Sequence, residues 1–379
     1  MQKHQQRRRQ RLPVTEVSPR QFLQGPCPSL AVSELPFLSP LPLFDVRTAE
    51  EYTQGHIPGA LNQPLFDHFE RSTIGTLYKQ VSPESAMAAG LRYVEPRVQQ
   101  LVESFQPWQK QPLIVYCARG GMRSASVVRL LNSEGFNAQQ LRGGYKHYRQ
   151  HVLQALEQWS PSLIVLHGPT GVGKTLLLKQ LPDHLDLEDL AQHRSSLFGG
   201  IHRHPRTQRQ FEGLLHQAKL TLPTDRLFFI EGESRKVGPV FIPTPLAKAM
   251  QKGQKVLLHA SLETRIDRTL ADYRVEDEAT VAEVDQILQS LRMALGRQLV
   301  DHLRDCLRQN RLRELVAILL NDYYDPRYFN SMKNYHYAAE FSAENLNQTV
   351  DDLRKFRDDV AAASGWTWQF LYAGSEELY

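Results

Sequence analysis

A cysteine at the end of a short apolar segment is the first feature of the sequence that could carry out chemistry. Cys117 follows the predicted buried strand 113–116 and begins the run Cys-Ala-Arg-Gly-Gly-Met-Arg-Ser, which leads into a predicted helix. Backbone N–H groups in such a loop form a concave surface that binds anions and favours thiolate over thiol. Gly120 and Gly121 allow backbone conformations that a side chain would hinder, and Arg123 adds a cationic clamp. These residues predict a catalytic site in which Cys117 attacks sulfur, selenium or phosphorus.

A glycine-rich loop with the spacing of a phosphate-binding motif is the second candidate site. Residues 168–175 read Gly-Pro-Thr-Gly-Val-Gly-Lys-Thr and lie between a predicted strand, 163–166, and a predicted helix. In this context backbone N–H groups wrap phosphates, the lysine bridges phosphate oxygens, and the last hydroxyl can reach a bound Mg²⁺. The predicted phosphate-binding residues are Gly168, Gly171, Gly173, Lys174 and Thr175.

An acid at the end of a second apolar strand usually completes a phosphate loop of this kind. The segment 227–230 predicts such a strand, and Glu231 and Glu233 follow it in place of the usual aspartate. Either acid can serve the loop as a metal partner, and the alternative is a pair of solvated acids. The sequence marks no residue that would position an attacking water, so the loop can bind a diphosphate without hydrolysing it.

Both candidate sites require parallel β-sheets. Strand, loop and helix follow one another at each site, which is the βα unit of a parallel sheet, and segments 43–47 and 256–259 predict further strands. From about residue 262 the leucines recur at helical spacing. We therefore predict an α/β fold, with an N-terminal parallel-sheet domain followed by a P-loop NTPase-like α/β domain and a mostly helical C-terminal region. The predicted boundaries are a basic, disordered tail at 1–25, a first domain at 26–157, a P-loop domain at 158–260, and a helical region packed on it at 261–379.

Length and cysteine content exclude several classes of protein. A chain of 379 residues is long enough for about two or three domains that each bury a core. Its three widely spaced cysteines cannot form a disulfide framework or a four-ligand zinc site, so we expect a cytoplasmic protein without a resident metal centre. The sequence contains no apolar run of about 18 residues and no signal peptide, so we expect no membrane partner.

The first domain resembles the rhodanese family. The runs Asp-Val-Arg at 45–47 and Gly-His-Ile-Pro-Gly-Ala at 55–60 match the start of that fold, Cys117 matches its active-site cysteine, and Leu-Arg-Gly-Gly-Tyr at 141–145 matches its closing motif. The resemblance covers roughly residues 30–150. It implies a rhodanese-like fold in which Cys117 carries sulfur or selenium as a covalent adduct, whereas Asp45, Arg47 and His56 are mostly scaffold.

The cysteine loop departs from the rhodanese pattern in its length. Five residues separate Cys117 from Arg123, one more than in many sulfurtransferases, and this is the C-x5-R spacing of cysteine phosphatases. A larger loop suits an oxyanion of the size of phosphate better than thiosulfate.

The two domains together resemble the bacterial tRNA 2-selenouridine synthase family over nearly the whole chain. The runs Leu-Glu-Asp-Leu-x-x-His-Arg at 187–194, Glu-x-Glu-Ser-Arg at 231–235 and Asp-Tyr-Tyr-Asp-Pro at 322–326 contribute to the resemblance. It implies a transferase that acts on the wobble uridine of tRNA. The wobble 2-thiouridine is first geranylated on sulfur from geranyl diphosphate, and is then converted into 2-selenouridine with selenophosphate. The implied partners are tRNA and a supplier of selenophosphate, and no tightly bound cofactor is implied.

This resemblance assigns one chemical step to each site. Cys117 is expected to attack the selenium of selenophosphate, so that phosphate leaves against Arg123 and selenium passes to C2 of the uridine. We assign the loop 168–175 to the diphosphate of geranyl diphosphate. Two other functions stay open at this point: a cysteine phosphatase of the C-x5-R type, and a P-loop kinase with a regulatory rhodanese domain.

A bound tRNA would have to contact local clusters of arginine. Residues 1–25 contain six basic residues and one acid, and this tail accounts for the net charge of +4, so neither domain is basic overall. Arginines gather in 202–209 and 304–313, where they suit contacts with a phosphate backbone, although solvated helix faces are the alternative. The predicted tRNA contacts are Arg203, Arg206, Arg209, Arg304, Arg308 and Arg311.

Overall fold

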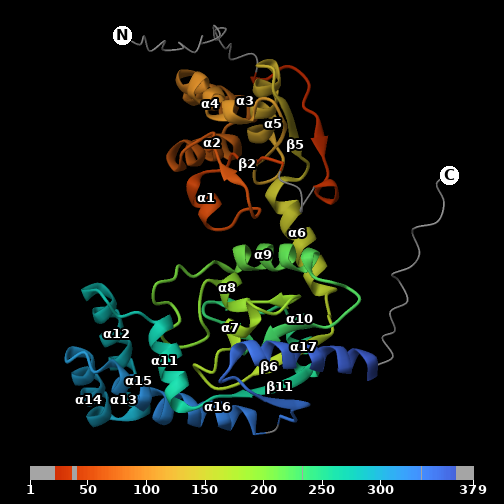
Figure 1. Ribbon diagram of the computed structural model, residues 1–379. Coiled ribbons are helices and arrows are strands. Elements are labelled where there is room, and N and C mark those ends of the chain that lie inside the picture. The colour runs from red at the N-terminus through yellow and green to blue at the C-terminus, as the bar shows by residue number, and fades with distance from the viewer. Residues whose placement is uncertain (1–21, 36–40, 233, 334, 364–379) are drawn as a thin grey trace, which may run out of the picture. The chain divides into compact units, whose positions relative to one another are not determined.

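The computed structural model describes residues 22–35, 41–232, 234–333 and 335–363 (Figure 1). The chain divides into two compact units, Met1–His151 and Val152–Tyr379. The division falls inside helix α6 (Gly144–Glu157), whereas we predicted a domain boundary after Glu157. Each unit contains its own five-stranded sheet, and the predicted α/β class with parallel sheets is confirmed.

All strand pairs of the sheet in the first unit are parallel, in the order β1-β5-β4-β2-β3. The central strand β4 reads Pro-Leu-Ile-Val-Tyr and is buried from its second residue onward, as expected of a strand that is covered on both faces. It ends immediately before Cys117. The strands are β1 (Ser29–Leu30), β2 (Leu43–Asp45), β3 (Leu61–Asn62), β4 (Pro112–Tyr116) and β5 (Asn137–Leu141).

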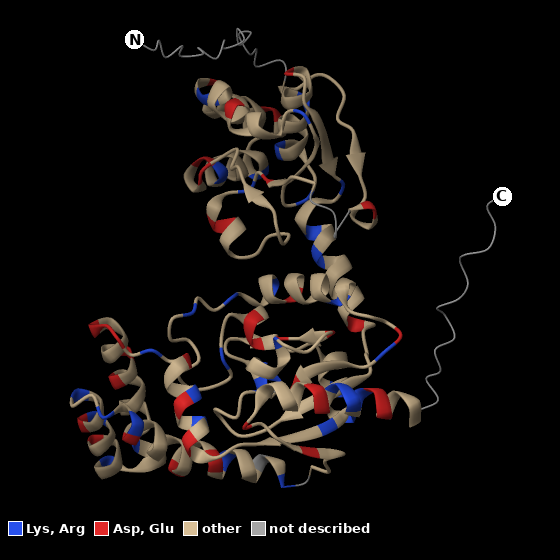
Figure 2. Cartoon of the chain, viewed as in Figure 1, with Lys and Arg blue, Asp and Glu red and all other residues tan. Residues whose placement is uncertain are grey.

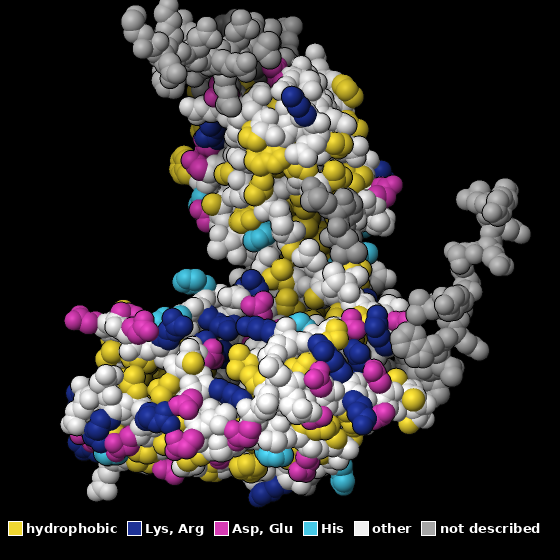
Figure 3. Space-filling view, viewed as in Figure 1, with side chains coloured by type: hydrophobic (Ala, Val, Ile, Leu, Met, Phe, Trp, Pro, Cys, Tyr) yellow, Lys and Arg dark blue, Asp and Glu magenta, His cyan; other side chains and the backbone are white. Residues whose placement is uncertain are grey.

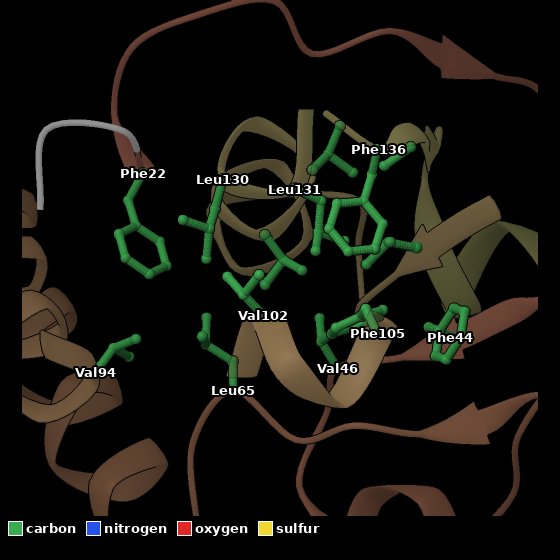
Figure 4. Close-up of a cluster of buried hydrophobic side chains, with 14 of the residues drawn as sticks. Phe22, Phe44, Val46, Leu65, Val94, Val102, Phe105, Leu130, Leu131 and Phe136 are labelled. Atoms are coloured by element: carbon green, nitrogen blue, oxygen red, sulfur yellow. The ribbon is translucent and has the colours of Figure 1, made fainter. Parts of the chain in front are cut away.

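Helices pack on this sheet and form the core of the first unit. Phe44 from the sheet, Phe105 from α4 and Leu131 from α5 are fully buried, and Figure 4 shows them within one cluster. Phe22 also belongs to this cluster, so the packed structure includes part of the predicted tail, while residues 1–21 lie outside the described residues. The helices are α1 (Ala49–Thr53), α2 (His68–Gln80), α3 (Pro83–Val94), α4 (Val98–Phe105) and α5 (Met122–Ser133).

The sheet of the second unit has the order β12-β11-β6-β8-β7, again with parallel pairs only. Strand β8 lies directly beside β6, so the acid that ends β8 comes next to the loop that follows β6. Strand β12 lies in the region predicted as mostly helical, where its short alternating pattern gave no clear signal. The strands are β6 (Leu163–His167), β7 (His184–Leu185), β8 (Phe228–Glu231), β11 (Gln254–His259) and β12 (Ala339–Ser342), and β9 (Lys236–Val237) pairs separately with β10 (Val240–Phe241).

The helices of the second unit form two groups, and Figure 1 shows α12 to α15 gathered to one side of the sheet, beyond α11. The first group comprises α7 (Lys174–Leu178), α8 (Leu187–Ala191), α9 (Gln208–Thr221), α10 (Thr244–Lys252), α11 (Leu262–Asp272) and α17 (Leu346–Ala363). The second group comprises α12 (Glu278–Ser290), α13 (Arg292–Leu295), α14 (Arg297–Arg308), α15 (Leu312–Ile318), a π-helical segment (Leu319–Tyr324) and α16 (Asp325–Met332). Residues of α12, α14 and α15 form a hydrophobic cluster that also includes Phe198, Ile201 and Ile266. In the described part of the chain, no helix is both long and apolar enough to cross a membrane.

Candidate functional site

Cys117 lies at the end of β4, where a chain of hydrogen bonds reaches its sulfur. The Ser124 hydroxyl donates to Cys117 Sγ at 3.1 Å, and the Gln140 side-chain amide donates to Ser124 Oγ at 2.8 Å. Because Ser124 Oγ accepts from Gln140, its single proton is left to donate to the sulfur or to the Gly121 carbonyl, which lies at 3.3 Å. A hydroxyl that donates to the sulfur would stabilise negative charge on it during nucleophilic attack. Ser124 ends the run that the sequence analysis singled out, although no role was predicted for it, whereas Gln140 was not predicted because it comes from β5 and only the folded sheet brings it to the loop.

The backbone of the cysteine loop makes close contacts with the predicted closing motif. Gly120 has φ +61°, and a Cβ there would lie 2.7 Å from the Gly143 nitrogen. Tyr145 N donates to the Cys117 carbonyl at 2.9 Å, so the residues after β5 hold the loop in place. A Cβ at Gly121 would meet nothing within 4 Å, and this residue has φ −97°. The predicted steric need for glycine therefore applies to Gly120 and not to Gly121.

Arg123 is held by an acid from a different helix. Its guanidinium donates to both carboxylate oxygens of Glu51, at 2.7 and 3.3 Å, and the two side chains are 14% and 29% exposed. Burial raises the pKa of Glu51, but hydrogen bonds and the charge of Arg123 outweigh it and leave the pKa below the ordinary value. Arg123 also lines the pocket that contains Cys117. Glu51 thus fixes the orientation of the predicted cationic clamp, a role that was not predicted because Glu51 lies far from Arg123 in the chain.

Asp45, Arg47 and His56 stabilise the start of the first unit. Asp45 and Arg47 form a buried ion pair at 2.5 Å, and Arg47 also donates to the Gly55 carbonyl at 2.8 Å. The His56 ring stacks on Tyr52 with ring centroids 3.7 Å apart, and burial lowers the pKa of His56. None of the three predicted scaffold residues is among the described residues that line the pocket at Cys117.

A pocket of about 990 Å³ opens at Cys117 and extends along α2 and α3. Arg119 and Arg123 from the loop line it together with Arg71 from α2. Burial lowers the pKa of Arg71, and the charge of Arg123 acts in the same direction. An anionic ligand beside these three cations would relieve their mutual repulsion. Arg71 was not predicted, because its helix lies far from Cys117 in sequence.

The phosphate loop of the second unit has the backbone shape that its sequence predicts. Gly171 has φ +79°, and a Cβ there would lie 2.6 Å from the Arg265 carbonyl oxygen. Gly173 has φ +101° and faces Arg268, while Lys174 Nζ donates to the Gly168 carbonyl at 2.7 Å. The predicted residues Gly168, Gly171 and Gly173 lie in the turn between β6 and α7, and Lys174 and Thr175 are the first two residues of α7.

Glu231 is the predicted acid that the structure brings to this loop. Its carboxylate is buried at the end of β8, and Thr175 Oγ1 donates to Glu231 Oε2 at 3.4 Å. A hydroxyl and a carboxylate are oxygen ligands of the kind that Mg²⁺ prefers, so Thr175 and Glu231 are the residues that would hold it. Glu233 lies outside the described residues.

Two arginines of α11 donate hydrogen bonds to the backbone of the phosphate loop. Arg265 Nε donates to the Thr170 carbonyl at 2.8 Å, and its guanidinium forms an ion pair with Asp325 at 2.6 Å. Arg268 donates to the Val172 carbonyl at 2.6 Å. Asp325 belongs to the Asp-Tyr-Tyr-Asp-Pro run that sequence reasoning noted without a role. The structure explains it as the counterion of a buried arginine that supports the loop.

The Leu-Glu-Asp-Leu-x-x-His-Arg run also lies near the phosphate loop. Burial raises the pKa of Glu188, while hydrogen bonding from Ser195 and the charge of Lys174 oppose that rise. Arg194 pairs with Asp272 at 2.7 Å and stacks on the Tyr273 ring at 4.4 Å. This run therefore packs the segment after α8 against α11.

The six arginines predicted as tRNA contacts already interact with other groups of the protein. Arg203 and Arg206 donate to backbone carbonyls of α8, at 3.5 and 2.8 Å, and Arg209 lies in the first turn of α9. Arg304, Arg308 and Arg311 pair with Asp285, Asp305 and Glu314 at 2.6, 2.5 and 2.5 Å. Figure 2 accordingly shows acidic and basic residues interspersed on α12 to α15, whereas Figure 3 shows a band of Lys and Arg side chains elsewhere on the visible face of this unit. Contact of the six arginines with tRNA stays a prediction.

Comparison with known proteins matches both units. Residues 161–357 match the family model "tRNA 2-selenouridine synthase AAA domain", and residues 33–151 match the rhodanese-like domain. A tRNA 2-selenouridine synthase of Pseudomonas syringae pv. tomato is 34% identical over 81% of this chain and 92% of its own length. Another from Hydrogenovibrio crunogenus is 34% identical over 83% of this chain and 96% of its own length. One from Nitrosomonas europaea is 35% identical over 65% of this chain and 67% of its own length. The chain belongs to the tRNA 2-selenouridine synthase family.

Proposed function

We propose that this chain converts the wobble 2-thiouridine of tRNA into 2-selenouridine through an S-geranyl-2-thiouridine intermediate, using geranyl diphosphate and selenophosphate. The observation that carries the proposal is the Cys117 site, where a hydroxyl donates to a cysteine sulfur. The sulfur lies in a C-x5-R loop, whose length suits an oxyanion of the size of phosphate. The family membership supports the same conclusion. The phosphate loop of the second unit supplies a separate site for the other substrate.

The phosphate loop is assigned to the geranylation step. The sulfur of 2-thiouridine attacks C1 of geranyl diphosphate, the C–O bond breaks, and diphosphate leaves with the bonding pair while the N3 proton of the uridine is lost to a base. Lys174 and the loop N–H groups stabilise the charge that develops on the leaving diphosphate. Thr175 and Glu231 would hold Mg²⁺, which supplies further charge neutralisation when it is bound.

Geranylation prepares the uridine for exchange of its sulfur. A thiocarbonyl carbon has a poor leaving group, whereas S-alkylation converts it into a thioimidate from which a thiolate can depart. The geranylation step therefore has to precede the selenium step. This order gives each of the two anion-binding loops one reaction to catalyse.

The selenium step is assigned to Cys117, and electron balance decides which atom it attacks. The resemblance implies attack on selenium with a selenium adduct on Cys117. That adduct, with phosphate as the other product, would require an oxidant, because selenium in selenophosphate and in 2-selenouridine is already at the selenide level. Attack of the Cys117 thiolate on phosphorus needs none: the S–P bond forms, the P–Se bond breaks, and hydroselenide leaves with the bonding pair.

Hydroselenide then completes the exchange beside Cys117. It adds to C2 of the S-geranyl uridine, its proton passes to N3, and geranylthiolate leaves. Water hydrolyses the phosphocysteine, which releases phosphate and returns the thiolate. Arg123, held by Glu51, and the loop N–H groups neutralise the phosphoryl group throughout.

Intact-mass analysis of the protein mixed with selenophosphate under anaerobic conditions tests the assignment of Cys117. We expect a phosphoryl adduct in the wild type and no adduct in Cys117→Ala. An adduct with the isotope pattern of selenium would instead assign attack to selenium and require a reductant for turnover. The absence of any adduct on Cys117 would refute its role as the nucleophile.

A cysteine phosphatase is the second candidate function. The specific observation in its favour is the same C-x5-R loop, in which the serine after the arginine donates to the nucleophilic sulfur. Hydrolysis of an aryl phosphate by the wild type and its loss in Cys117→Ser would support this function. Selenation of tRNA without phosphatase turnover would exclude it.

A further inference from the structure

The pocket at Cys117 is far larger than selenophosphate requires. A cavity of about 150 Å³ accommodates benzene, so a ten-carbon chain needs about 250 Å³ by proportion. The pocket holds about 990 Å³, which leaves room for a pyrimidine ring and a phosphate group besides such a chain. Its size therefore points to a ligand with a bulky part that is not the phosphate.

Most of the wall beyond the cysteine loop is apolar. It is built from α2, α3 and the residues Phe22 and Leu23, and Figure 4 shows Phe22 and Val94 at the end of the core cluster away from Phe44. Apolar side chains that face a large cavity favour an apolar ligand, because burial of its surface removes it from water. The apolar lining includes Phe22, Phe66, Ile74, Met87, Leu91 and Val94.

The charged groups of the pocket are all cationic among its described lining residues. Arg119 and Arg123 belong to the cysteine loop, and Arg71 and Lys79 lie on α2, where Arg71 interacts electrostatically with Cys117 and Arg123. No Asp or Glu is among the described residues that line the cavity. The pocket is thus amphipathic, with a nucleophile and three arginines near the cysteine loop and mostly apolar walls elsewhere. A ligand that joins an apolar chain to a phosphate-bearing polymer matches this distribution.

The apolar pocket next to the phosphate loop in the second unit is a contrasting case. It is lined by residues that include Thr170, Phe198 and Tyr273, but it holds only about 60 Å³. That volume is well below the approximately 250 Å³ that a ten-carbon chain needs. Of these two apolar pockets, only the one at Cys117 can enclose a geranyl group without rearrangement.

We propose that the pocket at Cys117 binds the geranyl group of S-geranyl-2-thiouridine and receives geranylthiol after the C2–S bond breaks. This inference rests on the proposed function. The inference extends the proposed function, because it makes the alkyl chain a recognition element for the selenium step. Binding the chain along α2 and α3 places C2 of the uridine toward the cysteine loop, and the apolar walls exclude water from the departing thiolate.

The test compares two anticodon stem-loop RNAs, one with S-geranyl-2-thiouridine and one with S-methyl-2-thiouridine. We expect the wild type to bind the S-geranyl RNA at least about tenfold more tightly, because only its chain buries apolar surface in the pocket. Met87→Glu, which introduces a charge into the half-buried wall, should reduce this preference to about threefold or less. Met87→Leu keeps an apolar surface and should retain most of the preference.

Met293→Glu is the matched control, because Met293 is 98% exposed in the second unit. It should bind both RNAs like the wild type. Equal binding of the two RNAs by the wild type would overturn the pocket proposal whether or not selenation occurs, and so would an unchanged preference in folded Met87→Glu. Tight S-geranyl binding without a Cys117 adduct or selenation would retain the pocket and refute the proposed function, so the two failures are distinguishable.

Discussion

The two anion-binding loops of this chain follow central strands of parallel sheets, yet their surroundings differ. The cysteine loop is supported by neighbours within its own sheet unit, through Gln140, Ser124 and the closing motif after β5. The phosphate loop is supported by two arginines of α11 and a buried acid of β8. The first loop presents a nucleophile and opens into about 990 Å³, whereas the second presents a lysine beside an apolar pocket of about 60 Å³. Under the proposed function, similar backbone cradles serve covalent chemistry in one unit and leaving-group stabilisation in the other.

Replacing the nucleophile should have the largest effect and should separate the two loops. Cys117→Ser should reduce selenation of pre-geranylated tRNA by at least about 1,000-fold, because the reaction loses its attacking thiolate. Geranylation, followed by mass spectrometry of digested tRNA, should stay within about twofold of the wild type. Cys306→Ala, which changes a buried cysteine of the second unit, is the control and should retain selenation. Equal loss of both activities in Cys117→Ser would contradict the separation.

Replacing the lysine of the phosphate loop should produce the opposite pattern. Lys174→Ala should slow geranylation by about 100-fold, because the leaving diphosphate loses one preorganised cation. Selenation of pre-geranylated tRNA should persist. Lys179→Ala removes the same charge from an exposed position just after α7 and should leave both activities near the wild-type level. If Lys174→Ala abolished selenation and spared geranylation, the assignment of this loop to geranyl diphosphate would be wrong.

Removing the counterion behind the phosphate loop should destabilise the second unit. Asp325→Asn leaves Arg265, whose side chain is 7% exposed, without its carboxylate partner. We expect a loss of about 3 kcal/mol in the free energy of unfolding, measured with urea and a probe of the second unit. Asp305→Asn breaks a surface pair with Arg308 and should cost less than about 0.5 kcal/mol. Comparable losses in the two variants would show that Arg265 does not need Asp325.

Removing the hydroxyl beside the nucleophile should have a smaller effect, confined to the first loop. Ser124→Ala deletes the hydrogen bond to Cys117 Sγ and should slow alkylation of Cys117 by iodoacetamide about tenfold at neutral pH. Ser126→Ala, on the same helix, is the control for the loss of a hydroxyl from the pocket wall. An unchanged alkylation rate in Ser124→Ala would mean that the backbone of the loop alone activates the sulfur.

Acidification should weaken the second unit through His167, which directly precedes the phosphate loop. Burial and the charges of Lys174 and Lys255 lower the pKa of His167 to about 4, and neither ring nitrogen has a hydrogen-bond partner among the described residues. Between about pH 6.5 and 4 the unfolded chain binds the proton and the folded chain does not, so stability falls as pH decreases. We expect His167 to contribute a loss of about 1 kcal/mol between pH 6.5 and 5.5. His167→Phe should show a shallower pH dependence of urea unfolding, and an unchanged slope would contradict the assignment to His167.

Much of both candidate sites could be predicted because their geometry is local in sequence. The glycines, Lys174 and Thr175 occupy eight consecutive residues, and a strand-loop-helix context is enough to shape such a loop. The same holds for Cys117 and Arg123, although the need for glycine at Gly121 was overestimated. The fold class followed from apolar segments of strand length and from leucines at helical spacing.

The remaining features depend on contacts between distant segments. Gln140 reaches Ser124 from another strand, and Glu51 reaches Arg123 from another helix. Asp325 pairs with Arg265 across a long stretch of chain, and Asp285 of α12 pairs with Arg304 of α14. Strand β12 was missed, because four residues with an alternating pattern carry little signal in a helical region.

The amino-acid sequence by itself determined which atoms of this protein can do chemistry: a thiol in a five-residue loop, and a lysine and a hydroxyl in a phosphate loop. It did so because short loops between a strand and a helix take their shape from neighbouring residues. Only the tertiary structure decided what surrounds those atoms. The amide of Gln140 at Ser124, the acid beside Thr175 and the large apolar pocket arise from side chains that are separated in the chain, and burial strengthens their polar interactions.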